Sequence, residues 1–526
     1  MTRASYGAAG AAVIVAIALA LGLTLRLVRL DVRPMHHDEA NQAVKFGALL
    51  ERGDYAYDAH DHHGPTLYYL TLPVAWLRGQ ATLASLDEWT LRGMPAAFGT
   101  ATILLLPLLL PAGIGRTTVA AAAVLMALSP AMVFYSRMYI QESMFACFAL
   151  TFAFAIGRAT TERGVRWPVL AGIAAGLTAA TKETSVVVIP ASLAACALAW
   201  RSLGSTRPSV APANARWWRA PLVGLVTGAG IAALFYSSFL AHPGGAREPF
   251  RAAATYFQRG VDPAGHVHPW HYYLGLLSWS SSGGLVWTEA LVLVLAAVGA
   301  VTACTPPDPS RPEAAFWRRY LAANAAITLT IFSAIPYKTP WNLLPFYALT
   351  IVAAGIGVSA LAQATTSRRV HVLLAVVLAI ASGHLGWQAW RASVVYASDP
   401  RNPYVYAQTV PDAVRMAARI RDLAALHRER EQMPVTVIAP PDEQWPLPWY
   451  LRTMTRVAYW TDAKDAPDLN APVIVSSIGH VEMLDAALGD RYVSEFFGLR
   501  PDVLLTLYVE RGLWERFLSR AALGGS

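Results

Sequence analysis

Apolar stretches near the length of a bilayer-spanning helix recur through residues 8–390 of this chain. The hydrocarbon core of a bilayer is about 30 Å thick, so a helix that crosses it needs roughly 20 apolar residues. With 55% hydrophobic and 14% charged residues, the 526-residue chain is also far more apolar than an ordinary soluble protein. The sequence therefore predicts an α-helical polytopic membrane protein.

About eleven of these stretches are candidates for transmembrane helices. They lie at residues 8–25, 93–112, 118–135, 143–157, 168–181, 184–200, 220–241, 283–303, 320–336, 342–362 and 370–390. The apolar segment at residues 65–77 is shorter and contains two prolines, which favours an interfacial segment that does not cross. The first stretch is followed by arginines instead of a small-residue cleavage site, so we expect an uncleaved first span.

The charges in the loops predict the side on which each loop lies. Arginines gather around residues 116, 158–166, 201–219, 311–319 and 368–369. The loop at residues 31–92 is net acidic. Because arginine-rich loops favour the inner side, we expect the 31–92 loop and the C-terminal tail on the outer side of a plasma (inner) membrane. An active site in this loop would then be extracytoplasmic.

Two other classes of function find no support in the composition. The net charge of +8 comes from arginines at span ends and in loops, which form no basic face for nucleic acid. Cys147, Cys196 and Cys304 lie in or beside apolar stretches without CxxC spacing. They therefore indicate neither a disulfide framework nor a thiolate metal site.

The tail at residues 391–526 differs in character from the membrane part at residues 1–390. Residues 411–430 have the apolar spacing of a helix, and VEMLDAALG and LWERFLSR are further helical segments. PVTVIAP, RVAYW, APVIVSS and VLLTLYVE are typical of short buried strands. We therefore expect a small extracytoplasmic α/β domain, and it lacks the glycine-rich loop of a nucleotide-binding site.

Titratable residues are concentrated directly after the first span. Residues 35–69, MHHDEANQAVKFGALLERGDYAYDAHDHHGPTLYY, hold five histidines and six carboxylates. Ionisable groups at a membrane surface are costly enough to be candidates for function. A loop that only connected two spans would not need them.

The other predicted outer loops add further charged groups. Arg137 and Glu142 lie in SRMYIQES, Lys182 and Glu183 in TKET, and Lys338 in PYKTPW. Transfer from a lipid-linked sugar phosphate needs cations for the anionic leaving group and a base for the acceptor hydroxyl. Carboxylates and cations on one side of the membrane suit that reaction.

The order of these motifs resembles the polytopic lipid-phosphate-dependent glycosyltransferases of the GT-C type, including protein O-mannosyltransferases and lipid A aminoarabinose transferases. The motifs are HDEA, GDYAYDAHDHHGPTLYY, SRMYIQES, TKET and PYKTPWNLLPFYAL. With HHDEA and EQWPLPWYLR, the chain is still more similar to the flippase-activity-associated proteins grouped with archaeal-type glycosylation. The resemblance extends over most of the chain.

The resemblance implies a GT-C-like fold and a set of site residues. It implies that Asp38 is the catalytic base, with Glu39 beside it. The aminoarabinose transferases have a lysine before the proline of the second motif, whereas this chain has His63 and Gly64 before Pro65. A protonated His63 would have to replace that lysine. The candidate substrate-binding residues are His37, His62, His63, Arg137, Glu142, Lys182, Glu183 and Lys338.

Each assignment has a structural alternative. Asp38 and Glu39 could cap a helix that starts near Ala40, since carboxylates favour helix N-termini. Lys182 and Lys338 could anchor span ends, and Arg137 could pair with Glu142 along one helix. A metal site remains open as well, because imidazole and carboxylate suit zinc or manganese. Its candidate ligands are His60, His62 and His63 with Asp58 or Asp61.

The function that we expect is an inverting glycosyltransferase. It would move a sugar from a polyprenyl-phosphate donor to a glycan, lipid or protein acceptor on the outer face of the membrane. We expect membrane lipids as its surroundings, no cofactor and no nucleic-acid partner. The alternatives are an accessory or carrier protein for translocation of lipid-linked glycans and a noncatalytic sugar-binding scaffold.

Overall fold

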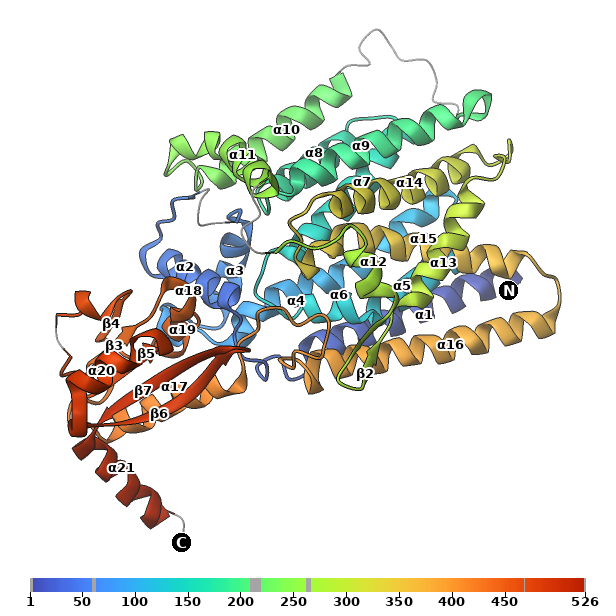
Figure 1. The fold of residues 1–526 in the computed structure, drawn as a ribbon. Coiled ribbons are helices and arrows are strands. Elements are labelled where there is room, and N and C mark those ends of the chain that lie inside the picture. The colour runs from blue at the N-terminus through green and yellow to red at the C-terminus, as the bar shows by residue number, and fades with distance from the viewer. Residues whose placement is uncertain (1–2, 59–62, 209–218, 262–265, 468, 525–526) are drawn as a thin grey trace.

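The computed structural model describes residues 3–58, 63–208, 219–261, 266–467 and 469–524. It consists of a bundle of long helices and a smaller part with a mixed sheet (Figure 1). The long helices and their short partner α6 are α1 (Arg3–Leu27), α4 (Glu88–Leu105), α5 (Arg116–Leu128), α6 (Pro130–Tyr135), α7 (Glu142–Thr161), α8 (Arg166–Ala179), α9 (Ser185–Ser202), α10 (Arg219–Tyr236), α13 (Ala290–Ala303), α14 (Pro312–Ala334), α15 (Leu344–Gln363) and α16 (Arg368–Trp390).

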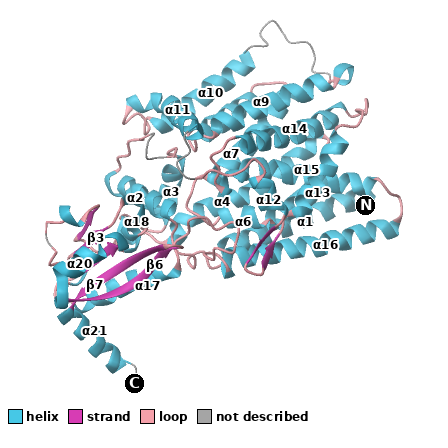
Figure 2. Cartoon of the chain, in the orientation of Figure 1, coloured by secondary structure: helices cyan, strands magenta, loops and turns pink. Residues whose placement is uncertain are grey.

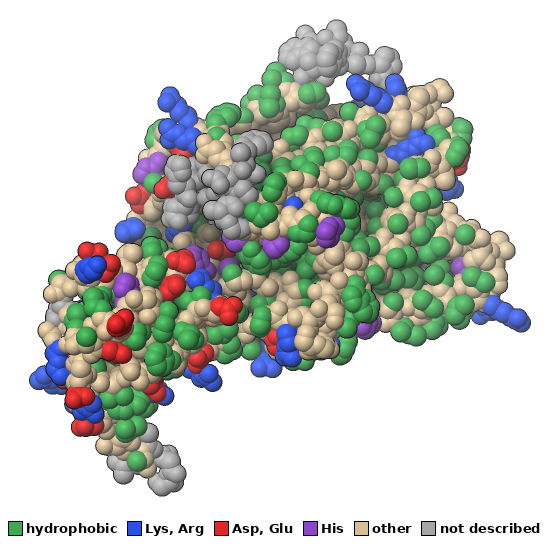
Figure 3. Space-filling view, in the orientation of Figure 1, with side chains coloured by type: hydrophobic (Ala, Val, Ile, Leu, Met, Phe, Trp, Pro, Cys, Tyr) green, Lys and Arg blue, Asp and Glu red, His purple; other side chains and the backbone are tan. Residues whose placement is uncertain are grey.

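The apolar helices make the chain a multi-pass membrane protein. Seven helices of the described ranges are long and apolar enough to cross a bilayer, and three further apolar helices are shorter. The flank of the bundle seen in Figure 3 is mostly hydrophobic, and charged side chains gather over the sheet-containing part. The described residues therefore support seven to ten apolar helices, fewer than the predicted eleven or so.

Two of the predicted spans are too long, each for a local reason. The span at residues 118–135 is divided at Ser129, where Pro130 starts α6 as its first residue. The span at residues 283–303 begins within a hairpin of β1 (Ser280–Ser282) and β2 (Leu285–Trp287). Gly283 and Gly284 have φ values of 51° and 78°, a turn conformation that glycine adopts without strain.

The membrane part also holds four shorter helices, α2 (His37–Arg52), α3 (Thr66–Leu77), α11 (Glu248–Val261) and α12 (Tyr272–Ser278). Of these, α2 and α3 lie between the bundle and the tail (Figure 1). The predicted interfacial segment forms α3, whose twelve residues reach roughly 18 Å. That length is less than the hydrocarbon core of a bilayer.

The tail forms a five-stranded mixed sheet with helices on both faces (Figure 2). Its strands are β3 (Val435–Ile438), β4 (Val457–Trp460), β5 (Val473–Ser477), β6 (Tyr492–Arg500) and β7 (Val503–Glu510), and its helices are α17 (Pro411–Leu426), α18 (Pro441–Gln444), α19 (Leu447–Tyr450), α20 (Val481–Leu488) and α21 (Arg511–Gly524). The strand order is β4-β3-β5-β7-β6, with β4, β3 and β5 parallel and β7 and β6 antiparallel. The sequence predicted every strand of this sheet except β6.

Helix α19 joins the tail to the end of the bundle. Trp449 is fully buried, and its indole Nε1 donates to Glu88 Oε1 at 3.0 Å. The Tyr450 hydroxyl accepts from the backbone amide of Met35 at 2.7 Å, directly before α2. These contacts hold the tail against the segment that carries HHDEA.

Candidate active site

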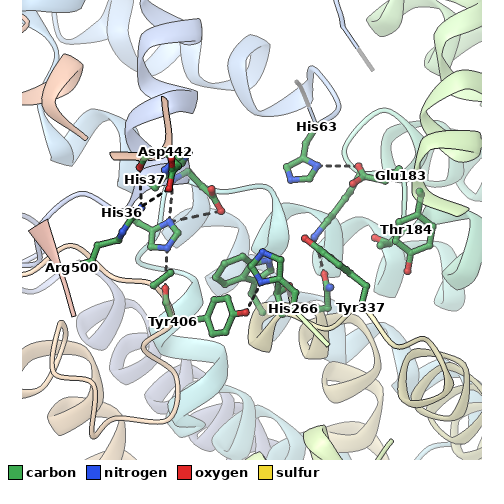
Figure 4. A pocket seen from close by; sticks show the side chains of 17 residues that line it. His36, His37, His63, Glu183, Thr184, His266, Tyr337, Tyr406, Asp442 and Arg500 are labelled. Carbon is green, nitrogen blue, oxygen red and sulfur yellow. Dashed lines mark hydrogen bonds and ion pairs between the residues drawn. The ribbon is translucent and has the colours of Figure 1, made fainter. Parts of the chain in front are cut away.

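A cavity of about 470 Å³ lies where the bundle meets the tail. Figure 4 shows His36 and His37 on one side of it and His63 and Glu183 on the other. The lining residues are His36, His37, Asp38, His63, Lys182, Glu183, Thr184, Tyr256, His266, Tyr337, Thr339, Trp341, Asn342, Tyr406, Ala407, Asp442 and Arg500. Segments far apart in sequence therefore combine titratable groups of both signs around one cavity.

The first turn of α2 is held by a capping box. His36 is the N-cap, and its ring Nδ1 accepts a hydrogen bond from the Asp38 amide at 3.0 Å. Glu39 in turn accepts from the His36 amide at 3.0 Å. His36 Nε2 lies 3.0 Å from the Tyr406 carbonyl oxygen, so Nε2 carries the hydrogen and donates it. This arrangement fixes the ring and the backbone that presents Asp38.

Asp38 faces the cavity with 38% of its side chain exposed. His36 Nδ1 is 3.8 Å from its carboxylate. Burial opposes ionisation of this carboxyl group, but its electrostatic interactions with His36, His37, His63 and Lys182 outweigh burial and lower the pKa of Asp38. A carboxylate that is ionised and accessible can accept a proton from a bound hydroxyl group.

Glu39 points the other way and has no exposed surface. Arg92 donates to it from Nε at 2.7 Å and from Nη2 at 2.9 Å, and the Tyr139 amide donates at 2.8 Å. Arg33 Nη2 lies 3.4 Å away. Although burial raises the pKa of Glu39, the two guanidinium groups lower it to about 2. Glu39 does not line the cavity, and it occupies the capping position that the sequence offered as an alternative.

The opposite wall is built at the turn between α8 and α9. The Lys182 ammonium group pairs with Glu142 and donates to Asn342 Oδ1 at 2.8 Å. Next to it, Glu183 Oε2 lies 3.0 Å from His63 Nδ1. Burial raises the pKa of Glu183, but the charges of His63 and Lys182 and the hydrogen bond from His63 lower it to about 2.

Two of the predicted substrate-binding cations are not among the lining residues. Arg137 is buried and donates to the carbonyl oxygens of Leu25 at 2.8 Å and Arg29 at 2.9 Å. Lys338 is 1% exposed, and its ammonium group donates to carbonyl oxygens, including that of His268 at 3.0 Å. Backbone carbonyl groups left free at helix ends and in loops attract both side chains, since buried acceptors need donors.

The alternative offered for Arg137, a pair with Glu142, does not form. Arg137 lies in the turn after α6, whereas Glu142 is the first residue of α7. The two residues therefore do not share a helical face. Glu142 does not line the cavity and instead pairs with Lys182, which does.

His37 lines the cavity as expected, and its partners come from the tail. Its ring centroid is 6.0 Å from that of Trp445. Burial lowers the pKa of His37. His62, the remaining predicted residue, lies outside the described residues, as do His60 and Asp61 of the metal alternative. Within the described ranges, no group of three or more His, Cys, Asp or Glu side chains is arranged to hold a metal.

Several lining residues were not predicted. Tyr406 comes from the segment between α16 and α17, and its hydroxyl group bonds His266 Nδ1. Asp442 and Arg500 come from the tail, with 3.7 Å between Oδ2 and Nη2. Asp442 directly precedes the EQWPLPWYLR motif, which could have indicated it. Arg500 ends a strand that the sequence did not reveal.

Comparisons with known proteins agree with this architecture. Residues 16–239 match the family model described as dolichyl-phosphate-mannose-protein mannosyltransferase. No curated protein matches the sequence.

Solved structures share the fold at low sequence identity. ArnT from Cupriavidus metallidurans bound to undecaprenyl phosphate has 16% identity and a TM-score of 0.62, covering 95% of this chain and 98% of its own. The oligosaccharyltransferase of Archaeoglobus fulgidus with a tethered acceptor peptide has 13% identity and a TM-score of 0.57, covering 93% of this chain and 74% of its own. The same archaeal enzyme, AglB, in complex with an inhibitory peptide and a dolichol-phosphate has 14% identity and a TM-score of 0.55, with coverages of 93% and 74%. The chain therefore shares the fold of these lipid-phosphate-dependent enzymes, and its residues 16–239 are similar to the dolichyl-phosphate-mannose-protein mannosyltransferase family.

Proposed function

We propose that this protein is an inverting glycosyltransferase that moves a sugar from a polyprenyl-phosphate donor to an acceptor hydroxyl group. One observation carries the proposal: a single cavity holds an accessible carboxylate, Asp38, and, on its opposite wall, the N–H donors of Lys182 and His63. Attack on the sugar from the side opposite the leaving phosphate needs a base and a cation on different walls. The relatives bound to undecaprenyl phosphate and dolichol-phosphate support a lipid phosphate as the leaving group.

In this proposal Asp38 takes the proton of the acceptor as its oxygen attacks the anomeric carbon. The bond from that carbon to the phosphate oxygen breaks, and both electrons leave with the polyprenyl phosphate. Lys182 has two hydrogen-bond partners among the described residues, which leaves its third N–H for the phosphate. His63 adds a second donor, and Glu183 and Glu142 keep these cations in position.

The remaining predicted site residues have supporting roles in this proposal. Glu39 fixes the first turn of α2. His37 lies near Trp445, beside the route by which the acceptor would enter the cavity. Arg137 and Lys338 stabilise the loops around the cavity through backbone carbonyls. The tail, residues 391–526, covers the cavity of the membrane part, residues 1–390, and its Asp442 and Arg500 help to select the acceptor.

The test is turnover of a labelled polyprenyl-phosphate sugar by the protein in membrane vesicles that contain the native acceptor. We expect release of polyprenyl phosphate with transfer of label to the acceptor. Asp54→Asn is a matched control, because Asp54 is exposed and pairs with His242 outside the cavity. Movement of intact lipid-linked sugar between leaflets without release would support the carrier alternative instead.

We also propose that the cavity and the tail face the outer side of the plasma membrane, as the arginine-rich loops favour. A cysteine at Ala466, in a Cys304→Ser background, should react with an impermeant thiol reagent in intact cells. A cysteine at Arg163 should be protected. The reverse pattern would place the cavity on the inner side.

A further inference from the structure

Arg391 lies at the end of α16, away from the cavity, with its guanidinium group enclosed by aromatic rings. Its Cζ atom is 4.5 Å from the ring centroid of Trp387, 4.9 Å from that of Tyr396 and 5.3 Å from that of Trp287. Trp287 is fully buried, and its Nε1 is anchored on the Arg401 carbonyl oxygen at 3.1 Å. The rings therefore hold the guanidinium group in one place before any ligand arrives.

The guanidinium group itself has no hydrogen-bond partner within the described residues. The hydrogen bonds of Arg391 involve only its backbone, which bonds to Gln388, Trp387 and Tyr396. A guanidinium group carries five N–H donors and is always protonated in proteins. The aromatic faces offset part of its positive charge. They accept none of the hydrogen bonds that the N–H groups donate in the plane of the guanidinium group. The N–H donors of the Arg391 guanidinium group are therefore available to an anionic ligand.

The position of Arg391 along α16 indicates where that anion comes from. The candidate span at residues 368–395 is only 6% buried, so α16 is surrounded by lipid along most of its length. Figure 1 shows it along one edge of the bundle. The helix from Arg369 to Arg391 is roughly 33 Å long at 1.5 Å per residue, close to the thickness of the hydrocarbon core. Arg391 therefore lies at the level of the lipid headgroups.

Exposed aromatic side chains support this depth. Trp387 is 52% exposed and Trp390 is 37% exposed, as in the aromatic belt of membrane proteins. At this level the common anion is the phosphate of a lipid, and a guanidinium group binds phosphate through two parallel hydrogen bonds. We propose that Arg391, held by Trp287, Trp387 and Tyr396, is a binding site for the phosphate group of a membrane lipid.

The site can be tested by lipid retention on the purified full-length protein, measured by native mass spectrometry. The probes are phosphatidylglycerol, polyprenyl monophosphate and diacylglycerol, which lacks phosphate. For Arg391→Gln we expect about a tenfold loss of retention for the lipid that occupies the site, because a charge-assisted pair is lost. Diacylglycerol retention should not change. Loss confined to phosphatidylglycerol assigns the site to bulk phospholipid, and loss confined to polyprenyl monophosphate assigns it to the carrier lipid.

Arg401→Gln is the matched control, because Arg401 already pairs with Asp399 at 2.7 Å and should not influence lipid retention. Tyr396→Phe keeps the ring and should retain lipid, whereas Tyr396→Leu should weaken retention. Arg391→Lys should bind less tightly than wild type, since it keeps the charge but loses the planar fork. Equal retention of both phosphate lipids by folded wild type and Arg391→Gln would overturn the proposal and leave Arg391 pointing to water.

Discussion

Two clusters of charged residues lie on either side of the first turn of α2, and their carboxylates differ in the hydrogen bonds that they accept. The clamp cluster, Glu39 with Arg33 and Arg92, is dry and has no access to the cavity. The pocket cluster, Asp38 with His63, Lys182 and Glu183, lines the cavity. Both clusters hold side chains of both charge signs. What differs is whether the carboxylate has already used its capacity to accept hydrogen bonds.

Glu39 accepts five hydrogen bonds, two from Arg92 and one each from Arg33, Tyr139 and His36, which uses the whole acceptor capacity of a carboxylate. Asp38 accepts no hydrogen bond from the described residues within 3.5 Å, and its neighbour His36 is 3.8 Å away. A saturated carboxylate stabilises the fold, whereas an unsaturated one can receive a proton from a ligand. The comparison therefore assigns structure to Glu39 and chemistry to Asp38.

The largest expected effect is that of Asp38→Asn. The variant keeps the shape of the side chain but loses its basicity, so we expect turnover to fall by about 10² to 10⁴ while donor affinity changes little. The measurement is kcat and donor binding of the purified variant beside Asp54→Asn. Activity that persists in Asp38→Asn would remove the distinction between the two clusters.

Glu39→Gln should chiefly lower stability. It leaves the buried charges of Arg92 and Arg33 without a counter-charge, which typically costs about 3 to 5 kcal/mol. The midpoint of thermal unfolding in detergent should fall well below that of wild type, whereas Asp38→Asn should have a midpoint near that of wild type. If the two variants had equal midpoints, Glu39 would not be the structural member of the pair.

Lys182→Met tests the cationic wall. Losing one charge-assisted contact to the donor phosphate typically costs about 1.5 to 3 kcal/mol, so we expect kcat/KM to fall roughly tenfold to a hundredfold. Lys338→Met, which removes a buried lysine that does not line the cavity, should leave donor binding nearly unchanged. A larger effect of Lys338→Met than of Lys182→Met would exchange the roles of the two lysines.

The smallest expected effect is a pH dependence of stability from Glu183. Its pKa is lowered from 4.5 to about 2 by His63 and Lys182 against the opposing effect of burial. The folded state therefore gains stability from this group above pH 4.5, and that gain is lost as the pH falls toward 2. Thermal midpoints measured across this range should fall less steeply for Glu183→Gln than for wild type. Identical slopes would show that the pair with His63 contributes nothing.

The sequence predicted those features that depend on local pattern. Hydropathy located the apolar helices, and short apolar runs typical of buried strands located β3, β4, β5 and β7. Strand β6 escaped because its side chains alternate between exposed and partly buried and include Glu495 and Gly498. Its pairing with β7, a long-range contact, is what makes it a strand.

The candidate site was only partly predictable for the same reason. HHDEA indicated two carboxylates, but nothing local says that Arg92, 53 residues later, covers one of them. Arg500 and Tyr406 reach the cavity through tertiary packing alone. The residue types indicated the chemistry. The tertiary contacts of Asp38 and Glu39 decided which of these two carboxylates is accessible.

The bond between His36 Nε2 and the Tyr406 carbonyl oxygen limits how this protein can be recombined with its relatives. Tyr406 belongs to the strap, residues 396–410, which precedes α17. Within the strap, Gln408 donates to the Pro34 carbonyl oxygen at 2.9 Å, and the Tyr404 hydroxyl group donates to Glu289 at 2.7 Å. A chimera joined at the end of α16 would bring a foreign strap against HHDEA. A chimera joined at Val410, just before α17, would exchange the sheet and its acceptor-facing side chains while the strap stays with the helices that shaped it.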